Sequence, residues 1–114
     1  PIGPPEKKMA TGFPHEHLDC YRLAIEVARW MGRAKFPPGC ADLADQGRRA
    51  ARSVPLNIAE AARQGQAGAQ HFRIALGSAT ETCAVLDVVD LPGGAEQQVK
   101  LRRIGAMLRR LSGG

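Results

Sequence analysis

Proline and glycine pairs interrupt this chain at three points, and the apolar residues between the breaks recur with helical spacing. Such pairs are the strongest local interruptions of regular structure. The breaks are FPPG, GQAG and LPGG, at residues 36–39, 65–68 and 91–94. They leave four segments of helical length, at about 17–34, 41–64, 69–90 and 95–111. Short connections between successive helices favour an all-α fold, an antiparallel up-down-up-down four-helix bundle.

Each segment carries apolar residues three and four positions apart, which predicts one buried stripe on each helix. The four stripes consist of Leu18, Tyr21, Ile25, Ala28 and Met31; of Leu43, Gly47, Ala50, Val54, Ile58 and Ala61; of Phe72, Ala75, Ala79, Cys83 and Leu86; and of Leu101, Ile104, Leu108 and Leu111. A length of 114 residues suits a single domain. We place this domain at 17–112 and interpret residues 1–16, which contain the first methionine, Met9, as a disordered leader or an expression remnant.

The third segment carries a second apolar face. At about 100° per residue, this face lies opposite the predicted core stripe. It consists of Ile74, Gly77, Val85 and Val88. Because aromatic residues make up only 4% of the chain, the core is thin, and self-association would bury more apolar surface. We therefore expect this face, together with Leu56, to form an oligomer interface; the alternative is a broadened core face.

The stretch SVPLNIAEAARQG, residues 53–65, places a proline in the middle of the second segment. The apolar stripe passes Pro55 without a change of phase, which predicts one continuous, kinked helix. The alternative is a true break, with Ser53 as the N-cap of a new helix, because Ser-x-Pro suits a first helical turn.

Polar residues line the edge of this stripe. Ser53, Asn57 and Glu60 share one lane of the second segment, and Ser78 and Glu81 occupy the motif ALGSATE of the third. Buried polar groups need hydrogen-bond partners. We expect these five residues to form one interhelical polar network that fixes the register of the two helices, and we treat Gln46 and Gln64 as a solvated flank.

Two motifs connect the chain to a known family. SVPLNIAEA, followed about 20 residues later by FRIALGSATE, resembles the paired signature of the four-helix-bundle proteins encoded in intervening sequences of bacterial 23S ribosomal RNA genes. LDCYRLAIEVAR at the start and IGAMLRRL at the end also fit this pattern, whereas the glycine usual after NIAE is Ala61 here. The resemblance implies a small antiparallel bundle that commonly forms a homo-pentamer. The family is also similar in fold and basic character to accessory proteins of diversity-generating retroelements, which associate with a reverse transcriptase and nucleic acid.

The net charge of +5 and the sequence pI of 9.7 favour anionic partners such as nucleic acid. Arginines concentrate on the polar sides of the second and fourth segments. They are Arg48, Arg49, Arg52 and Arg63, and Arg102, Arg103, Arg109 and Arg110. We expect these residues to contact RNA or DNA, or a reverse transcriptase, and the plainer alternative is a solvated surface. An oligomer would repeat each cluster, and phosphate binding rises steeply with the number of cations engaged.

The sequence contains no recognisable catalytic constellation, so we expect no enzyme, no cofactor, no metal and no small-molecule substrate. The cluster HEHLDC contains His15 and His17, but no matching second set of ligands occurs elsewhere. Cys20, Cys40 and Cys83 are widely spaced and lack the C-x-x-C pattern, which favours reduced thiols over a disulfide framework or a zinc site. No apolar run approaches the length of a membrane span, and we expect a cytoplasmic protein without membrane contact.

Overall fold

The described part of the chain, residues 12–113 of a computed structural model, contains helices and turns and no strand. The elements, in chain order, are η1 (Pro14–His17), α2 (Asp19–Arg33), α3 (Ala41–Gln64), η2 (Gly65–Gly68), α4 (Ala69–Val88) and α5 (Gly94–Leu111). The all-α prediction is confirmed, and the observed helix ends differ from the predicted ends by at most two residues. None of the helices within this range is long and apolar enough to cross a membrane.

The predicted leader is described only in part. Residues 1–11 lie outside the described residues. Pro14, His15 and Glu16 belong to η1, a 3₁₀ turn that contacts α2 and α3. The ordered domain therefore includes residues that were expected to precede it.

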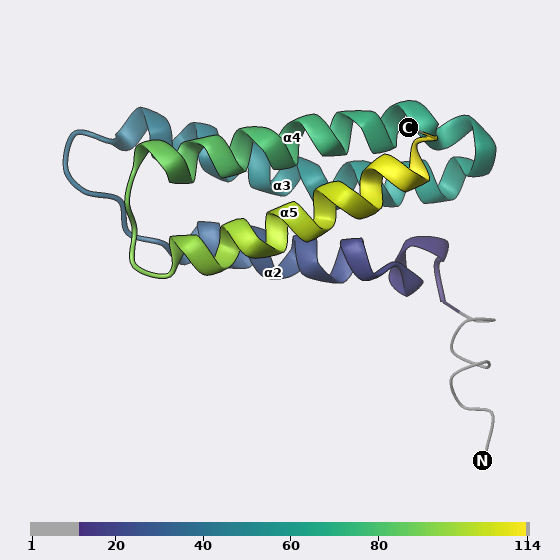
Figure 1. Ribbon diagram of the computed structural model, residues 1–114, viewed down its shortest axis with the longest axis horizontal. Helices are drawn as coiled ribbons and strands as arrows, with labels where there is room; N and C mark the ends of the chain where they lie inside the picture. Colours follow the sequence, from purple (N-terminus) through teal and green to yellow (C-terminus); the bar gives the residue numbers. More distant parts are fainter. Residues whose placement is uncertain (1–11, 114) are drawn as a thin grey trace, which may run out of the picture.

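The four α-helices lie side by side along the long axis of the molecule (Figure 1). Helix α2 packs against α3 and α5, and α4 packs against the same two helices. The connections that follow α2 and α4 lie at one end of the molecule, and η2 lies at the other end (Figure 1). The four helices thus surround a common interior.

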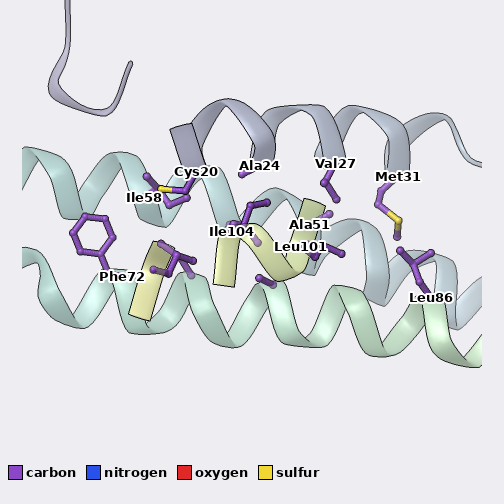
Figure 2. Close-up of a cluster of buried hydrophobic side chains, with 14 of the residues drawn as sticks. Cys20, Ala24, Val27, Met31, Ala51, Ile58, Phe72, Leu86, Leu101 and Ile104 are labelled. Carbon is purple, nitrogen blue, oxygen red and sulfur yellow. The ribbon is translucent and has the colours of Figure 1, made fainter. Parts of the chain in front are cut away.

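Side chains from all four helices fill this interior (Figure 2). On α2, the buried lane consists of Cys20, Ala24, Val27 and Met31, so the predicted stripe is displaced by one residue and only Met31 of it is fully buried. Two adjoining lanes of this helix are apolar, and the inner lane carries the smaller side chains. Small side chains let the helix axis approach its neighbours closely.

Helix α3 is continuous through Pro55, which is itself buried. The alternative of a break at Ser53 is therefore wrong. Pro55 still lacks the N–H group that would bond to the carbonyl of Ala51. The predicted stripe from Gly47 to Ala61 is buried at every position, while Leu43 is partly buried. On α5, Leu101, Ile104 and Leu108 are buried as predicted, whereas Leu111 is exposed.

Gly68 closes the corner between α3 and α4. A Cβ atom at this position would lie 2.0 Å from the backbone oxygen of Ala61 and 2.7 Å from its Cα atom. Backbone atoms of α3 therefore occupy the place of a side chain, and only glycine fits there. Gly32 in α2 is the opposite case, because a Cβ atom added to it meets nothing within 4 Å.

We predict that Gly68→Ala destabilises the fold by at least about 1–3 kcal/mol, the usual cost of overpacking, because α3 and η2 must move apart. Gly32→Ala is the control and should stabilise by about 0.5–1 kcal/mol, since alanine is favoured over glycine within a helix. Chemical denaturation of both variants measures the difference. Equal stabilities would show that the corner is not tightly packed.

Candidate functional site

Four polar side chains form a hydrogen-bonded chain between α3 and α4, here called the polar seam: Ser53, Asn57, His71 and Ser78. The hydroxyl of Ser78 donates to Ser53 Oγ at 2.9 Å. Asn57 Nδ2 donates to the same Oγ atom at 2.9 Å and to the backbone oxygen of Ser53 at 2.9 Å. His71 Nδ1 lies 3.0 Å from Asn57 Oδ1. The seam thus connects the two helices over two turns of α4.

The hydrogen bonds determine which atoms of the seam carry hydrogen. The backbone oxygen of Ser53 can only accept, so the Asn57 atom that faces it must be the amide nitrogen. Asn57 Oδ1 therefore faces His71 and requires a donor. His71 Nδ1 must carry the hydrogen in this arrangement. All the polar atoms of the Asn57 side chain have protein partners.

The seam contains three of the five residues predicted for one network, namely Ser53, Asn57 and Ser78. Glu60 instead pairs with Arg63 and accepts a hydrogen bond of 2.6 Å from Gln64, both on its own helix. The hydrogen bonds from Arg63 and then Gln64 lower the pKa of Glu60 to about 2, and Glu60 in turn raises the pKa of Arg63. Glu60 therefore makes these contacts within α3 and does not join the seam.

Glu81 also lies apart from the seam. Its Oε2 atom accepts a hydrogen bond of 2.9 Å from Gln46 on α3, at the exposed edge of the two helices. Gln46 is exposed, as expected for a solvated flank, and it is in addition an interhelical partner. His71 is the other partner that the sequence interpretation missed, although its spacing of seven residues from Ser78 places both on one side of α4.

The predicted oligomer face is only partly exposed. Leu56, Ile74 and Val88 are 69%, 42% and 68% exposed, and Gly77 is open to solvent. Val85, in contrast, is only 3% exposed, so its assignment to the outer face is wrong. Its Cγ1 atom lies 3.0 Å from the point where Gly47 would carry a Cβ atom, so the small glycine on α3 admits Val85 into the core. We call Leu56, Ile74, Gly77 and Val88 the outer patch.

Six of the eight predicted contact arginines are exposed and have no ion pair among residues 12–113. They are Arg49, Arg52, Arg102, Arg103, Arg109 and Arg110. Arg63 is exposed but is engaged by Glu60. These six side chains keep their donors available to a partner.

Arg48 has a different, structural role. It donates from Nε to the backbone oxygen of Met31 at 3.2 Å and from Nη2 to that of Ala34 at 2.9 Å. Its guanidinium also lies over the ring of Phe36, 5.5 Å from the centroid. Arg48 therefore satisfies carbonyl groups at the end of α2 and attaches this end to α3.

Arg102 and Arg109 line a groove of about 380 Å³ between α4 and α5. Leu76, Leu101 and Cys83 are among the other residues that line it. All three cysteines are free thiols, and burial raises the pKa of the Cys20 thiol.

His15 and His17 occupy η1. His15 packs edge-on against Tyr21, with ring centroids 4.6 Å apart, and His17 Nε2 is buried without a hydrogen-bond partner in the described range. Across residues 12–113, no three side chains of histidine, cysteine, aspartate or glutamate come together as a metal site would require.

A family model described as 23S rRNA-intervening sequence protein matches residues 16–108. The chain belongs to this family. The match spans α2, α3 and α4 and most of α5, and it includes all residues of the polar seam and the outer patch. The description of the 23S rRNA-intervening sequence protein family names no reaction, ligand or partner. A search of curated proteins found no match.

We predict that Asn57→Ala lowers the free energy of unfolding by about 1–3 kcal/mol, because it leaves His71 Nδ1 without its partner and removes two hydrogen bonds to Ser53, whose Oγ atom keeps only Ser78. Gln46→Ala removes an exposed interhelical hydrogen bond and should cost less than about 0.5 kcal/mol. Urea denaturation of the two variants provides the comparison. A destabilisation of Asn57→Ala no larger than that of Gln46→Ala would contradict a structural role of the seam.

Proposed function

We propose that this chain is a non-enzymatic, homo-oligomeric four-helix bundle that contacts RNA or DNA, or an enzyme that processes nucleic acid such as a reverse transcriptase. The observation that carries the proposal is the set of six exposed arginines without ion pairs in the described chain. Guanidinium groups bind phosphate through paired hydrogen bonds, and an arginine without a carboxylate partner gives up no ion pair when it does so.

The bundle has an antiparallel up-down-up-down topology in this proposal. Two observations support it: each helix packs against two others around the core, and successive connections lie at alternate ends of the molecule (Figure 1). In this topology the outward sides of α3 and α4 adjoin, so Leu56 and Ile74 belong to one surface.

Self-association through the outer patch, as a pentamer, is the second part of the proposal. Exposed large apolar side chains occur on α3 (Leu56), on α4 (Ile74 and Val88) and on α5 (Val99 and Leu111), whereas α2 presents none. A symmetric oligomer would bury this patch and would repeat the arginine clusters around its axis. Because the salt dependence and affinity of nucleic-acid binding grow with the number of cations engaged, the ring would bind more strongly than one copy.

A purely structural or protein-interaction module is the second candidate function. The apolar outer patch favours it, since such a surface suits a protein partner as well as another copy of the chain. In this case the arginines only keep the protein in solution. Capture of a protein partner that survives nuclease treatment would favour this candidate over the first.

We predict that Leu56→Asp reduces the assembly to smaller species while its helix content stays unchanged, because an exposed side chain is replaced and the core is untouched. Val99→Asp is the matched control, since Val99 is a similarly exposed apolar residue on α5. Light scattering and circular dichroism measure both properties. A monomeric unmodified protein, or equal effects of the two variants, would overturn the outer patch as the interface.

We predict that alanine at Arg102, Arg103, Arg109 and Arg110 weakens RNA binding and its salt dependence. The slope of log affinity against log salt should fall by about 0.7–0.9 for each phosphate group that the protein no longer neutralises. Lysine at the same four positions keeps the charge and should retain most of the slope. Electrophoretic mobility shifts with structured RNA at several salt concentrations test this. No binding even at low salt would remove the nucleic-acid part of the proposal.

A further inference from the structure

A second basic region lies where the end of α2 meets the beginning of α5. Residues of both helices line a cavity of about 380 Å³ there: Glu26, Arg29, Trp30, Arg33, Gln97 and Lys100. Lys100 Nζ lies 3.0 Å from Glu26 Oε1, so these two charges neutralise each other. Arg29 and Arg33 have neither an ion pair nor a side-chain hydrogen bond within residues 12–113. The cavity therefore keeps two unbalanced positive charges.

A buried amide also lacks a partner in this cavity. Gln97 is only 4% exposed, and its Oε1 atom is buried without a hydrogen bond from any described residue. Buried side-chain polar atoms nearly always have a partner. If the side-chain amide is flipped by 180°, the buried atom becomes the nitrogen, which is a donor and still needs a hydrogen-bond partner. Gln97 thus contains an unused polar atom that is closed to solvent, in a side chain that lines the same cavity as the two arginines.

Trp30 lines both this cavity and a second space. The second space measures about 300 Å³, and Ala34, Lys35, Leu91 and Pro92 also line it. Arg33 lines both spaces as well. Gly93, with φ +85°, lies against the indole, because a Cβ atom there would be 3.3 Å from Trp30 Nε1. The loop after α4 therefore brings its backbone close to the tryptophan.

The two adjoining spaces are together called the cleft. We propose that the cleft binds a nucleotide, either free or at the end of a nucleic-acid strand. Arg29 and Arg33 bind the phosphate, since guanidinium forks match phosphate oxygens. The base packs against the indole of Trp30, as bases do on aromatic side chains. The Gln97 side chain, whose Oε1 atom is closed to solvent in the free protein, turns toward the ligand and accepts a hydrogen bond from a ribose hydroxyl or a base N–H group.

A nucleotide fits the cleft better than simpler anions do. Inorganic phosphate would use the two arginines and leave Trp30 without a role. An acidic protein side chain would pair with the two arginines but would leave Gln97 Oε1 without a hydrogen-bond donor. A nucleotide combines an anion, hydrogen-bond donors and a planar ring within one molecule. Spaces of about 300–1,000 Å³ are typical of small-molecule sites, and each half of the cleft reaches this range.

The cleft does not depend on the arginines of the proposed function. Arg29, Arg33, Trp30 and Gln97 belong to α2 and to the first turns of α5, at the end of the molecule where the connections after α2 and α4 lie (Figure 1). The contact arginines of α5 come later in the helix. Variants of the two sets can therefore be tested separately, and failure of one proposal leaves the other in place.

The chain contains a single tryptophan, so intrinsic fluorescence reports directly on the cleft. The full protein is titrated with AMP, adenosine and inorganic phosphate. We expect a saturable fluorescence change with AMP and much weaker binding of adenosine, and phosphate should compete with AMP. Arg33→Ala should weaken AMP binding about tenfold or more, which is the effect of removing a charge-assisted hydrogen bond. Gln97→Met keeps the side-chain size and should weaken it several-fold.

Arg73→Ala is the matched control, because Arg73 is exposed on α4 and its replacement removes the same charge. An equal weakening by Arg73→Ala and Arg33→Ala would overturn the proposal, as would the absence of saturable AMP binding. Circular dichroism verifies that Gln97→Met is folded, and the exposed Arg29→Ala provides a second test that does not touch the core. A short 5′-phosphorylated RNA identifies the source: tighter binding than AMP indicates a strand end, and equal binding indicates a free nucleotide.

Discussion

The close contact between α3 and α4 is the constraint on which the rest of the structure depends. At one end of the pair, Gly68 rests directly on the backbone of Ala61. In the middle, the hydroxyl groups of Ser53 and Ser78 are hydrogen-bonded at 2.9 Å. A hydrogen bond of this length between two short side chains requires adjacent backbones and one definite register. The stretch around Pro55 is thus helical, and its residue Ser53 connects α3 to α4 by a hydrogen bond.

This contact determines which side chains remain available at the surface. With the small residues and the polar seam facing inward, Leu56 and Ile74 stay on the outside of the pair. Helices α2 and α5 then close the core from the other side, and Arg48 attaches the end of α2 to α3. The end of α2 also packs against α5, and Trp30 and Gln97 line the proposed nucleotide cleft there. The outer patch and the cleft both follow from the same helix arrangement.

The sequence predicts the helices well because proline and glycine pairs mark their ends and apolar residues follow helical spacing. Side-chain positions are less predictable where two adjoining lanes are both apolar. The buried lane of α2 depends on how closely its neighbours approach, and the burial of Val85 depends on Gly47 of α3, so a single helix reveals neither. Asn57 and Ser78 are recognisable as interhelical residues, but the role of His71 requires the distance between α3 and α4. The cleft combines two helices distant in the chain, so no local pattern indicates it.

A double-mutant cycle between Ser53 and Ser78 tests the central claim most directly. The free energies of unfolding of Ser53→Ala, Ser78→Ala and the double variant are measured by denaturation under the same conditions. Residues that share a hydrogen bond are coupled, and we expect an interaction energy of about 0.5–1.5 kcal/mol for this pair. Purely additive destabilisation, with no interaction energy beyond experimental error, would contradict the view that this bond holds α3 and α4 in register.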